Sequence, residues 1–185
     1  MTHHPAHGGV LLLIDLQKAI DDPSWGERST PDAEANQARL LALWRSRGWP
    51  VRHVRHDSVR PDSTYRPGQV GHEFREPAIP LPGEPVTAKT ANSAFLGTSL
   101  ASDLRDAGAR RLVVLGVATN NCVEATVRMA GNLDFDVFVV ADACIAFARP
   151  EWNGTPRSAE EVHAMSLANL DGEYATVVNT ADLMR

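Results

Sequence analysis

Short, continuously apolar runs alternate with longer amphipathic segments along this chain. The clearest run, residues 10–14, has no polar position, and such a run predicts a strand that is covered on both faces of a parallel sheet. Five further strands are predicted, at residues 51–56, 85–89, 112–115, 136–141 and 174–178.

The first amphipathic segment has clear helix boundaries. Thr30 suits the N-cap and Pro31 the first helical position, and Gly48 is suited to end the helix. Between them, one helical face collects Gln37, Leu40, Leu41 and Trp44. We therefore predict that this segment forms a helix that packs on the sheet.

Three later segments predict further helices. Leucines at four-residue spacing place one at about residues 98–107. Another runs from near Cys122 to about residue 132, and the last starts at a capping box formed by Ser158 and Glu161. Strands that alternate with helices imply an α/β fold, with a parallel sheet, right-handed crossovers and helices on both faces.

Residues 58–84 are irregular and rich in proline and glycine. A connection of this length in a compact domain is usually functional or disordered, and the interspersed Tyr65, Phe74 and Ile79 favour an ordered loop. We interpret this loop as a wall of a binding pocket.

The composition is that of one globular domain. The chain has 185 residues, 43% of them hydrophobic, without a compositional break, so we expect a single domain over residues 1–185. Residues 1–8 are expected to form a flexible leader, whose His3, His4 and His7 would make at most a weak adventitious metal patch.

The net charge of -5 and the isoelectric point near 5.8 argue against nucleic acid or an anionic membrane as the partner. No apolar stretch reaches the roughly 18 residues of a membrane span, and the N-terminus lacks the order of a secretory signal. We therefore expect a cytoplasmic protein that binds a small molecule or another protein. Cys122 and Cys144 are expected to be free thiols.

Three side chains suited to chemistry stand at predicted strand ends: Asp15, Lys89 and Cys122. Ligands bind at the carboxyl ends of strands in open α/β sheets, and a helix N-terminus after the strand would favour a reactive thiolate at Cys122. Each residue also has a simpler interpretation. Asp15 suits a turn or helix cap, Cys122 a buried structural thiol, and Lys89 a solvated surface position.

Three motifs occur in order at these positions. They are Asp-x-Gln starting at Asp15, Lys89 followed by ANSAFLGTSL at residues 91–100, and GVATNNCV at residues 116–123. Together they resemble the isochorismatase-like cysteine hydrolase superfamily, and the resemblance extends over residues 10–183. It implies a Rossmann-like three-layer α/β/α fold with a six-stranded parallel sheet, and a homodimer or higher homo-oligomer.

The resemblance also implies a Cys-Asp-Lys triad. Cys122 corresponds to the nucleophile, Asp15 to the acid/base that takes the thiol proton and later activates water, and Lys89 to the cation that keeps both ionised. A cis peptide bond is implied between Val117 and Ala118. It would turn the Ala118 N–H toward an oxyanion hole shared with the Cys122 N–H.

The retained cysteine favours one reaction within the superfamily. Members that hydrolyse the carbon–nitrogen bond of an amide or ureide need the thiol for a thioester intermediate, whereas isochorismatases, which cleave a vinyl ether, commonly carry another residue there. Two alternatives stay open: isochorismatase-type vinyl ether hydrolysis, and a non-catalytic redox or scaffold protein that kept the thiol.

Nicotinamidases of this superfamily bind a metal through an Asp and a His two positions later. Here Asp57 is present, but Val59 stands in place of the histidine, and His53, His56 and His72 do not restore the spacing. We therefore expect no metal and no cofactor. His53 and His56 are interpreted as strand residues, and Asp57 as a turn cap or a polar contact in the pocket.

Five residues are candidates for substrate contacts: Trp25, Tyr65, Phe74, Asn92 and Phe95. Each fits the core or a subunit interface about equally well, because pockets and interfaces use the same aromatic residues. His163 lies inside a predicted helix, and we interpret it as structural.

Overall fold

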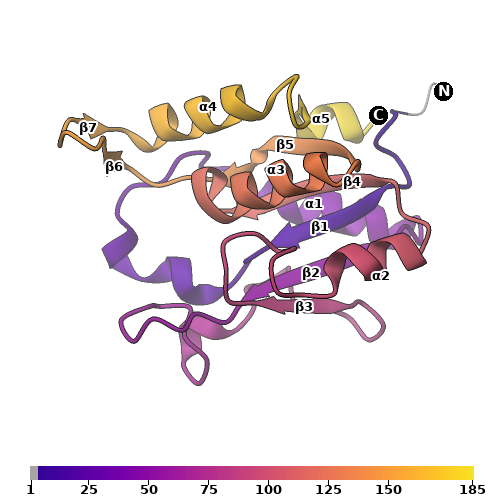
Figure 1. Cartoon of the computed structure of the whole chain (residues 1–185), viewed down its shortest axis with the longest axis horizontal. Coiled ribbons are helices and arrows are strands. Elements are labelled where there is room, and N and C mark those ends of the chain that lie inside the picture. The colour runs from indigo at the N-terminus through magenta and orange to yellow at the C-terminus, as the bar shows by residue number, and fades with distance from the viewer. Residues whose placement is uncertain (1–3) are drawn as a thin grey trace.

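A computed structural model of the chain describes residues 4–185, and its centre is a six-stranded parallel sheet (Figure 1). The spatial order of the strands is β3-β2-β1-β4-β5-β8. Their bounds are Val10–Ile14 (β1), Val51–His56 (β2), Val86–Lys89 (β3), Arg111–Val117 (β4), Asp136–Ile145 (β5) and Thr176–Val178 (β8). The predicted α/β architecture is therefore confirmed.

Helices cover both faces of the sheet. In Figure 1, α2 and α3 lie in front of the sheet and α1 lies behind it. The bounds are Ala33–Ser46 (α1), Leu100–Asp106 (α2), Glu124–Asn132 (α3), Ala159–Leu170 (α4) and Thr180–Leu183 (α5). Because helices pack on both faces, all five residues of β1 are buried, as its continuous apolar run predicts.

Helical termini differ most from the predictions. Helix α1 starts at Ala33 after Asp32, whereas Thr30 has a φ of 55° and is not the cap. The third helix does not start at Cys122. A π-helical turn, Thr119–Val123, precedes α3 and contains that cysteine. The capping box of Ser158 and Glu161 is present, because each accepts a backbone N–H of the other at the start of α4.

Two strand predictions also need correction. Strand β5 continues to Ile145, so Cys144 lies inside a strand and not after one. A two-stranded antiparallel hairpin, Arg149–Pro150 (β6) with Pro156–Arg157 (β7), was not predicted, because strands of two residues leave no hydrophobic period to detect.

The described part of the leader makes contacts with the rest of the chain. Ala6 is fully buried, the His4 ring packs edge-on against Phe138 at 5.7 Å, and His7 Nε2 lies 2.7 Å from the carbonyl oxygen of Leu183. These contacts place residues 4–7 beside β5 and α5, and the flexibility of the leader stays a prediction. The rest of the predicted leader at its N-terminal end, including His3, lies outside the described residues. Within the described chain, no helix has the length and apolar character to cross a membrane.

Gly116 permits a close approach between β1 and β4. Its φ is 140°, it pairs with Ile14, and the ladder between β4 and β5 shifts register between Val114 and Gly116. A Cβ atom at this position would lie 2.1 Å from the carbonyl oxygen of Ile14. The glycine is therefore needed both for the backbone conformation and for the space.

We predict that Gly116→Ala lowers the free energy of unfolding by about 3 kcal/mol or more, because the strands must separate and the backbone is strained. Urea unfolding measures the loss. Gly108→Ala is the matched control, since its φ of 68° is also positive but a Cβ there would meet nothing within 4 Å. Its loss should be about 1 kcal/mol. Equal losses in the two variants would contradict the steric argument.

Candidate active site

The sheet brings Asp15, Lys89 and Cys122 together at the carboxyl ends of its strands. Lys89 Nζ lies 2.6 Å from Asp15 Oδ2 and 3.2 Å from Cys122 Sγ. Lys89 is 2% exposed and Asp15 1% exposed, so this is a buried ionic contact and not a surface pair. The simpler interpretation of Lys89 as a solvated lysine is therefore wrong.

A fourth residue, His56, completes the contacts of Lys89. Its Nδ1 atom lies 3.1 Å from Lys89 Nζ, and His56 is the register partner of Lys89 in the parallel pair of β2 and β3. The sequence pattern predicted only a strand residue here. Its position follows from the strand order, because β2 separates the strand of Lys89 from the strand that leads to Asp15.

The Asp-x-Gln motif supports this arrangement through Gln17. The buried Gln17 side chain accepts a hydrogen bond from the His56 backbone N–H at 2.7 Å and donates one to the His56 carbonyl at 3.2 Å. It also donates to the His72 carbonyl at 2.9 Å. One amide side chain therefore ties the end of β1 to the end of β2 and to the long loop.

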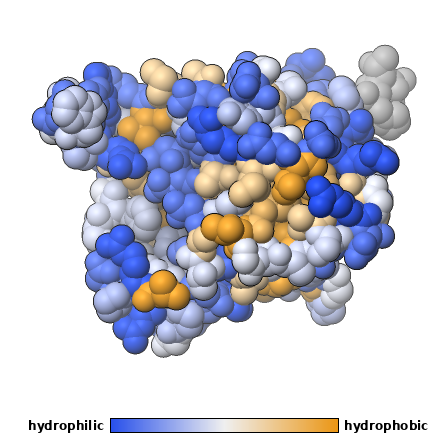
Figure 2. Space-filling view, viewed as in Figure 1, coloured by the Kyte–Doolittle hydropathy of each residue, from blue (hydrophilic) through white to orange (hydrophobic). Residues whose placement is uncertain are grey.

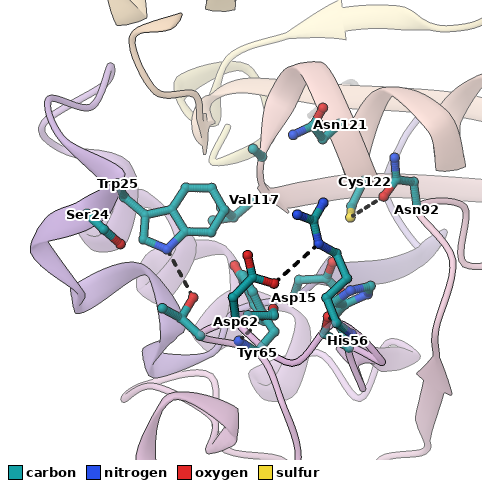
Figure 3. A pocket seen from close by; sticks show the side chains of 15 residues that line it. Asp15, Ser24, Trp25, His56, Asp62, Tyr65, Asn92, Val117, Asn121 and Cys122 are labelled. Carbon is teal, nitrogen blue, oxygen red and sulfur yellow. Dashed lines mark hydrogen bonds and ion pairs between the residues drawn. The ribbon is translucent and has the colours of Figure 1, made fainter.

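A pocket of about 390 Å³ is lined by Asp15, His56 and Cys122 (Figure 3). Trp25 faces Cys122 and Asn92 from the opposite side of the pocket, and its Nε1 donates to Thr64 Oγ1 at 3.2 Å. Asn92 Oδ1 lies 3.9 Å from Cys122 Sγ. Tyr65, from the loop predicted to form a wall, is also part of the lining.

Two of the predicted substrate contacts do not line this pocket. Phe74 packs against His53 with ring centroids 5.8 Å apart, and Phe95 stacks on Phe135 at 5.9 Å. Both rings pack against other side chains of the chain, which agrees with the alternative interpretation of these aromatic residues as core residues. Polar side chains without a periodic signal also line the pocket and were not predicted individually, although five of them belong to the long loop that was predicted to form a wall: Ser24, Ser58, Arg60, Asp62, Ser63, Thr64 and Asn121. His56, at the end of β2, lines it as well.

Burial shifts the pKa values of Cys122 and Asp15. Burial, and then the nearby Asp15 carboxylate, raise the pKa of the Cys122 thiol to about 12. Burial also raises the pKa of Asp15, although Lys89 opposes that shift. At that pKa Cys122 is a thiol at neutral pH, while the contact with the Lys89 ammonium favours the ionised form of Asp15. Burial therefore opposes the thiolate that a helix N-terminus would favour.

Helix α4 holds the turn that carries Cys122. Ser166 Oγ has one hydrogen to donate and lies between two acceptors, Glu124 Oε2 at 2.6 Å and the Thr119 carbonyl oxygen at 3.1 Å. The Thr119 hydroxyl is 2.9 Å from His163 Nδ1. These contacts give His163 the structural role assigned to it. The peptide bond between Val117 and Ala118, just before this turn, is cis.

Asp57 lies outside the pocket lining. Arg55 donates to its two oxygens at 2.8 and 3.1 Å, and His72 Nε2 is 2.8 Å from Oδ1. Its carboxylate is already paired with a guanidinium, which opposes the binding of a metal cation there.

One group of three side chains in the described part of the chain could hold a metal: Asp15, His56 and Cys122, with ligand atoms within 4.8 Å of one another. The Lys89 ammonium is in hydrogen-bonding contact with each of them. A divalent ion at this site would have to displace that cation.

A second cavity of about 880 Å³ lies between α4 and the β6–β7 hairpin, and exposed Trp152 and Met165 contribute to its lining. Figure 2 shows a small hydrophobic area near the start of α4 on this side. The cavity is larger than the first pocket but contains none of the three strand-end residues. We therefore place the candidate active site in the smaller pocket.

Known proteins are similar to this chain in sequence and in fold. Residues 9–182 match the family model described as Isochorismatase domain. An uncharacterised isochorismatase family protein of Bacillus subtilis, YrdC, is 40% identical over 174 residues, which cover 94% of this chain and 93% of that protein.

Two further comparisons cover nearly the whole chain. The crystal structure of an isochorismatase-family protein from Chromobacterium violaceum superimposes with a TM-score of 0.94 at 57% identity, covering 99% of this chain and 95% of the other. The ureidoacrylate amidohydrolase RutB of Enterobacter sp. is 27% identical over 198 residues, covering 97% of this chain and 83% of that protein.

We predict that iodoacetamide modifies Cys122 well before Cys144, because Cys122 is partly exposed at the pocket and Cys144 is fully buried. With the Cys122 pKa raised to about 12, the thiolate fraction and the labelling rate should rise about tenfold per pH unit between about pH 7 and 10. Mass spectrometry of peptides measures both. Equal labelling of the two cysteines, or a rate independent of pH, would contradict this assignment.

We also predict that chelation leaves any hydrolytic activity unchanged, since cationic side chains already contact both carboxylates that would attract a metal, Asp15 and Asp57. Dialysis against a chelator followed by metal analysis and an activity assay tests this on protein purified without an affinity tag. About one transition metal per chain, lost together with activity, would overturn it.

Proposed function

The chain is a hydrolase of the isochorismatase family, and we propose that it cleaves a carbon–nitrogen bond of a small amide or ureide with Cys122 as the nucleophile. One observation carries the proposal: the buried Lys89 ammonium contacts both the Asp15 carboxylate and the Cys122 sulfur beneath a pocket. A nucleophile, a base and a cation in mutual contact form the arrangement that acyl transfer to a thiol requires.

The first step is attack on the substrate carbonyl. The Cys122 thiol gives its proton to Asp15 as sulfur bonds to the carbonyl carbon. Asp15 Oδ1 supports this role, because it is buried without a hydrogen-bond partner among the described residues, while Oδ2 is held by Lys89. Its raised pKa makes it a stronger base than a solvated carboxylate.

The tetrahedral intermediate then loses its amine. The negative oxygen is stabilised by the backbone N–H groups of Ala118 and Cys122, which we propose as the oxyanion hole. The carbon–nitrogen bond breaks, the nitrogen takes the proton from Asp15, and a thioester on Cys122 remains. Asp15 next removes a proton from water, which attacks the thioester and releases the acid and the thiol.

The alternative functions fit the site less well. A redox-sensing thiol is normally an accessible thiolate with a low pKa, whereas burial raises the pKa of Cys122. Vinyl ether hydrolysis does not require a thiol, and the ureidoacrylate amidohydrolase among the relatives supports the amide branch. The homo-oligomer and the cytoplasmic location stay predictions, as does the single domain over residues 1–185.

We predict that Asp15→Asn and Lys89→Met each lose at least roughly 100-fold in kcat/KM, because each removes a group that holds or moves the reacting proton. Turnover of a panel of primary amides, ureides and isochorismate provides the assay. Lys18→Ala is the control, since Lys18 is exposed and pairs with Glu73 outside the pocket. Thermal unfolding of each variant separates loss of chemistry from loss of fold.

Three outcomes would contradict the proposal. The first is near-wild-type turnover in a folded Asp15 or Lys89 variant, and the second is activity that survives in Cys122→Ala. Turnover of isochorismate alone would replace the amide function with ether hydrolysis.

A further inference from the structure

We propose that His56 has two roles in this reaction: its Nδ1 atom holds one proton of the Lys89 ammonium, and its Nε2–H donates a hydrogen bond to an acceptor atom of the substrate. The inference rests on the proposed function, because the second role presupposes a substrate in the pocket. It extends that function by requiring the substrate to present an acceptor, and not a donor, to His56.

The contacts of Lys89 define the state of the imidazole. An ammonium has three N–H donors and no acceptor. Lys89 Nζ has three neighbours within hydrogen-bond distance: Asp15 Oδ2 at 2.6 Å, His56 Nδ1 at 3.1 Å and Cys122 Sγ at 3.2 Å. His56 Nδ1 must therefore accept, which places the proton of the neutral ring on Nε2.

The surroundings of His56 fix the ring in this orientation. The Gln17 side chain bonds both backbone groups of His56, and Tyr65 packs edge-on against the imidazole at 5.6 Å. Burial, and then the charge of Lys89, lower the pKa of His56 to about 4, although Asp57 opposes the shift. The ring is therefore neutral at neutral pH.

The second nitrogen is open to the pocket. No described residue forms a hydrogen bond with His56 Nε2, and His56 lines the same pocket as Cys122, Asn92 and Trp25. An N–H fixed beside the nucleophile can select and orient the substrate.

Nuclear magnetic resonance of the wild-type enzyme tests the tautomer without any substrate. Long-range ¹H–¹⁵N correlations at neutral pH should show His56 with its proton on Nε2 and an unprotonated Nδ1. The His56→Asn spectrum assigns the signal. A ring protonated on Nδ1, or an imidazolium, would overturn the proposal.

Two variants separate the two roles. Asn retains a side-chain oxygen near the position of Nδ1 but has no donor at Nε2, whereas Phe keeps the ring shape and removes both. We expect His56→Asn to lose about 10-fold in kcat/KM while Cys122 reacts with iodoacetamide within about twofold of wild type. His56→Phe should lose at least roughly 100-fold and change the pH dependence of that labelling.

His72→Gln is the matched control, because His72 is a partly buried histidine that contacts Asp57 and does not line the pocket. It should keep kcat/KM within about twofold. Wild-type kcat/KM in His56→Phe would refute both roles, and wild-type kcat/KM in His56→Asn would refute the substrate contact. If wild type hydrolyses no compound of the panel, the proposed function fails together with that contact, while the tautomer still decides whether His56 holds Lys89.

Discussion

The buried ammonium of Lys89 is the constraint on which the site depends. A charge that is 2% exposed loses several kcal/mol of hydration, and only partners with good geometry offset this loss. The partners come from the end of β1, the end of β2 and the turn after β4. They meet at one point only when the strands take the order β3-β2-β1-β4 in the observed register, so the same contacts that arrange the chemistry also specify the sheet.

The burial that removes the Lys89 ammonium from water also affects the protonation state in which the proposed reaction begins. A local argument from the helix N-terminus predicts a thiolate at Cys122, whereas desolvation, a property of the whole site, raises the pKa of this thiol to about 12. With this pKa, Cys122 is protonated at neutral pH. In the proposed mechanism Asp15, which shares Lys89 with the thiol, removes the proton when a substrate arrives, and a reactive sulfur is not left open to oxidants between turnovers.

The sequence predicts this site wherever the signal is local. Continuous apolar runs predict the strands, and Asp15, Lys89 and Cys122 follow from strand ends and from motifs that resemble a known superfamily. The role of His56 was not predicted, because it depends on β2 lying between β1 and β3, and chain order does not reveal this spatial order. Phe74 and Phe95, which were candidates for substrate contacts, do not line the pocket for a related reason. An aromatic residue packs equally well in a core or a pocket, and only tertiary contacts distinguish the two.

The Asp-x-Gln motif is a local sequence signal whose side chains reach the neighbouring strand and the long loop. Asp15 has a φ of 53°, a left-handed conformation that costs a non-glycine residue about 1–3 kcal/mol and persists only where surrounding contacts impose it. Two residues later, Gln17 bonds the backbone of His56 and the long loop. A short segment after β1 thus supplies Asp15, the base of the proposed mechanism, and through Gln17 it positions His56, the neighbour of Lys89.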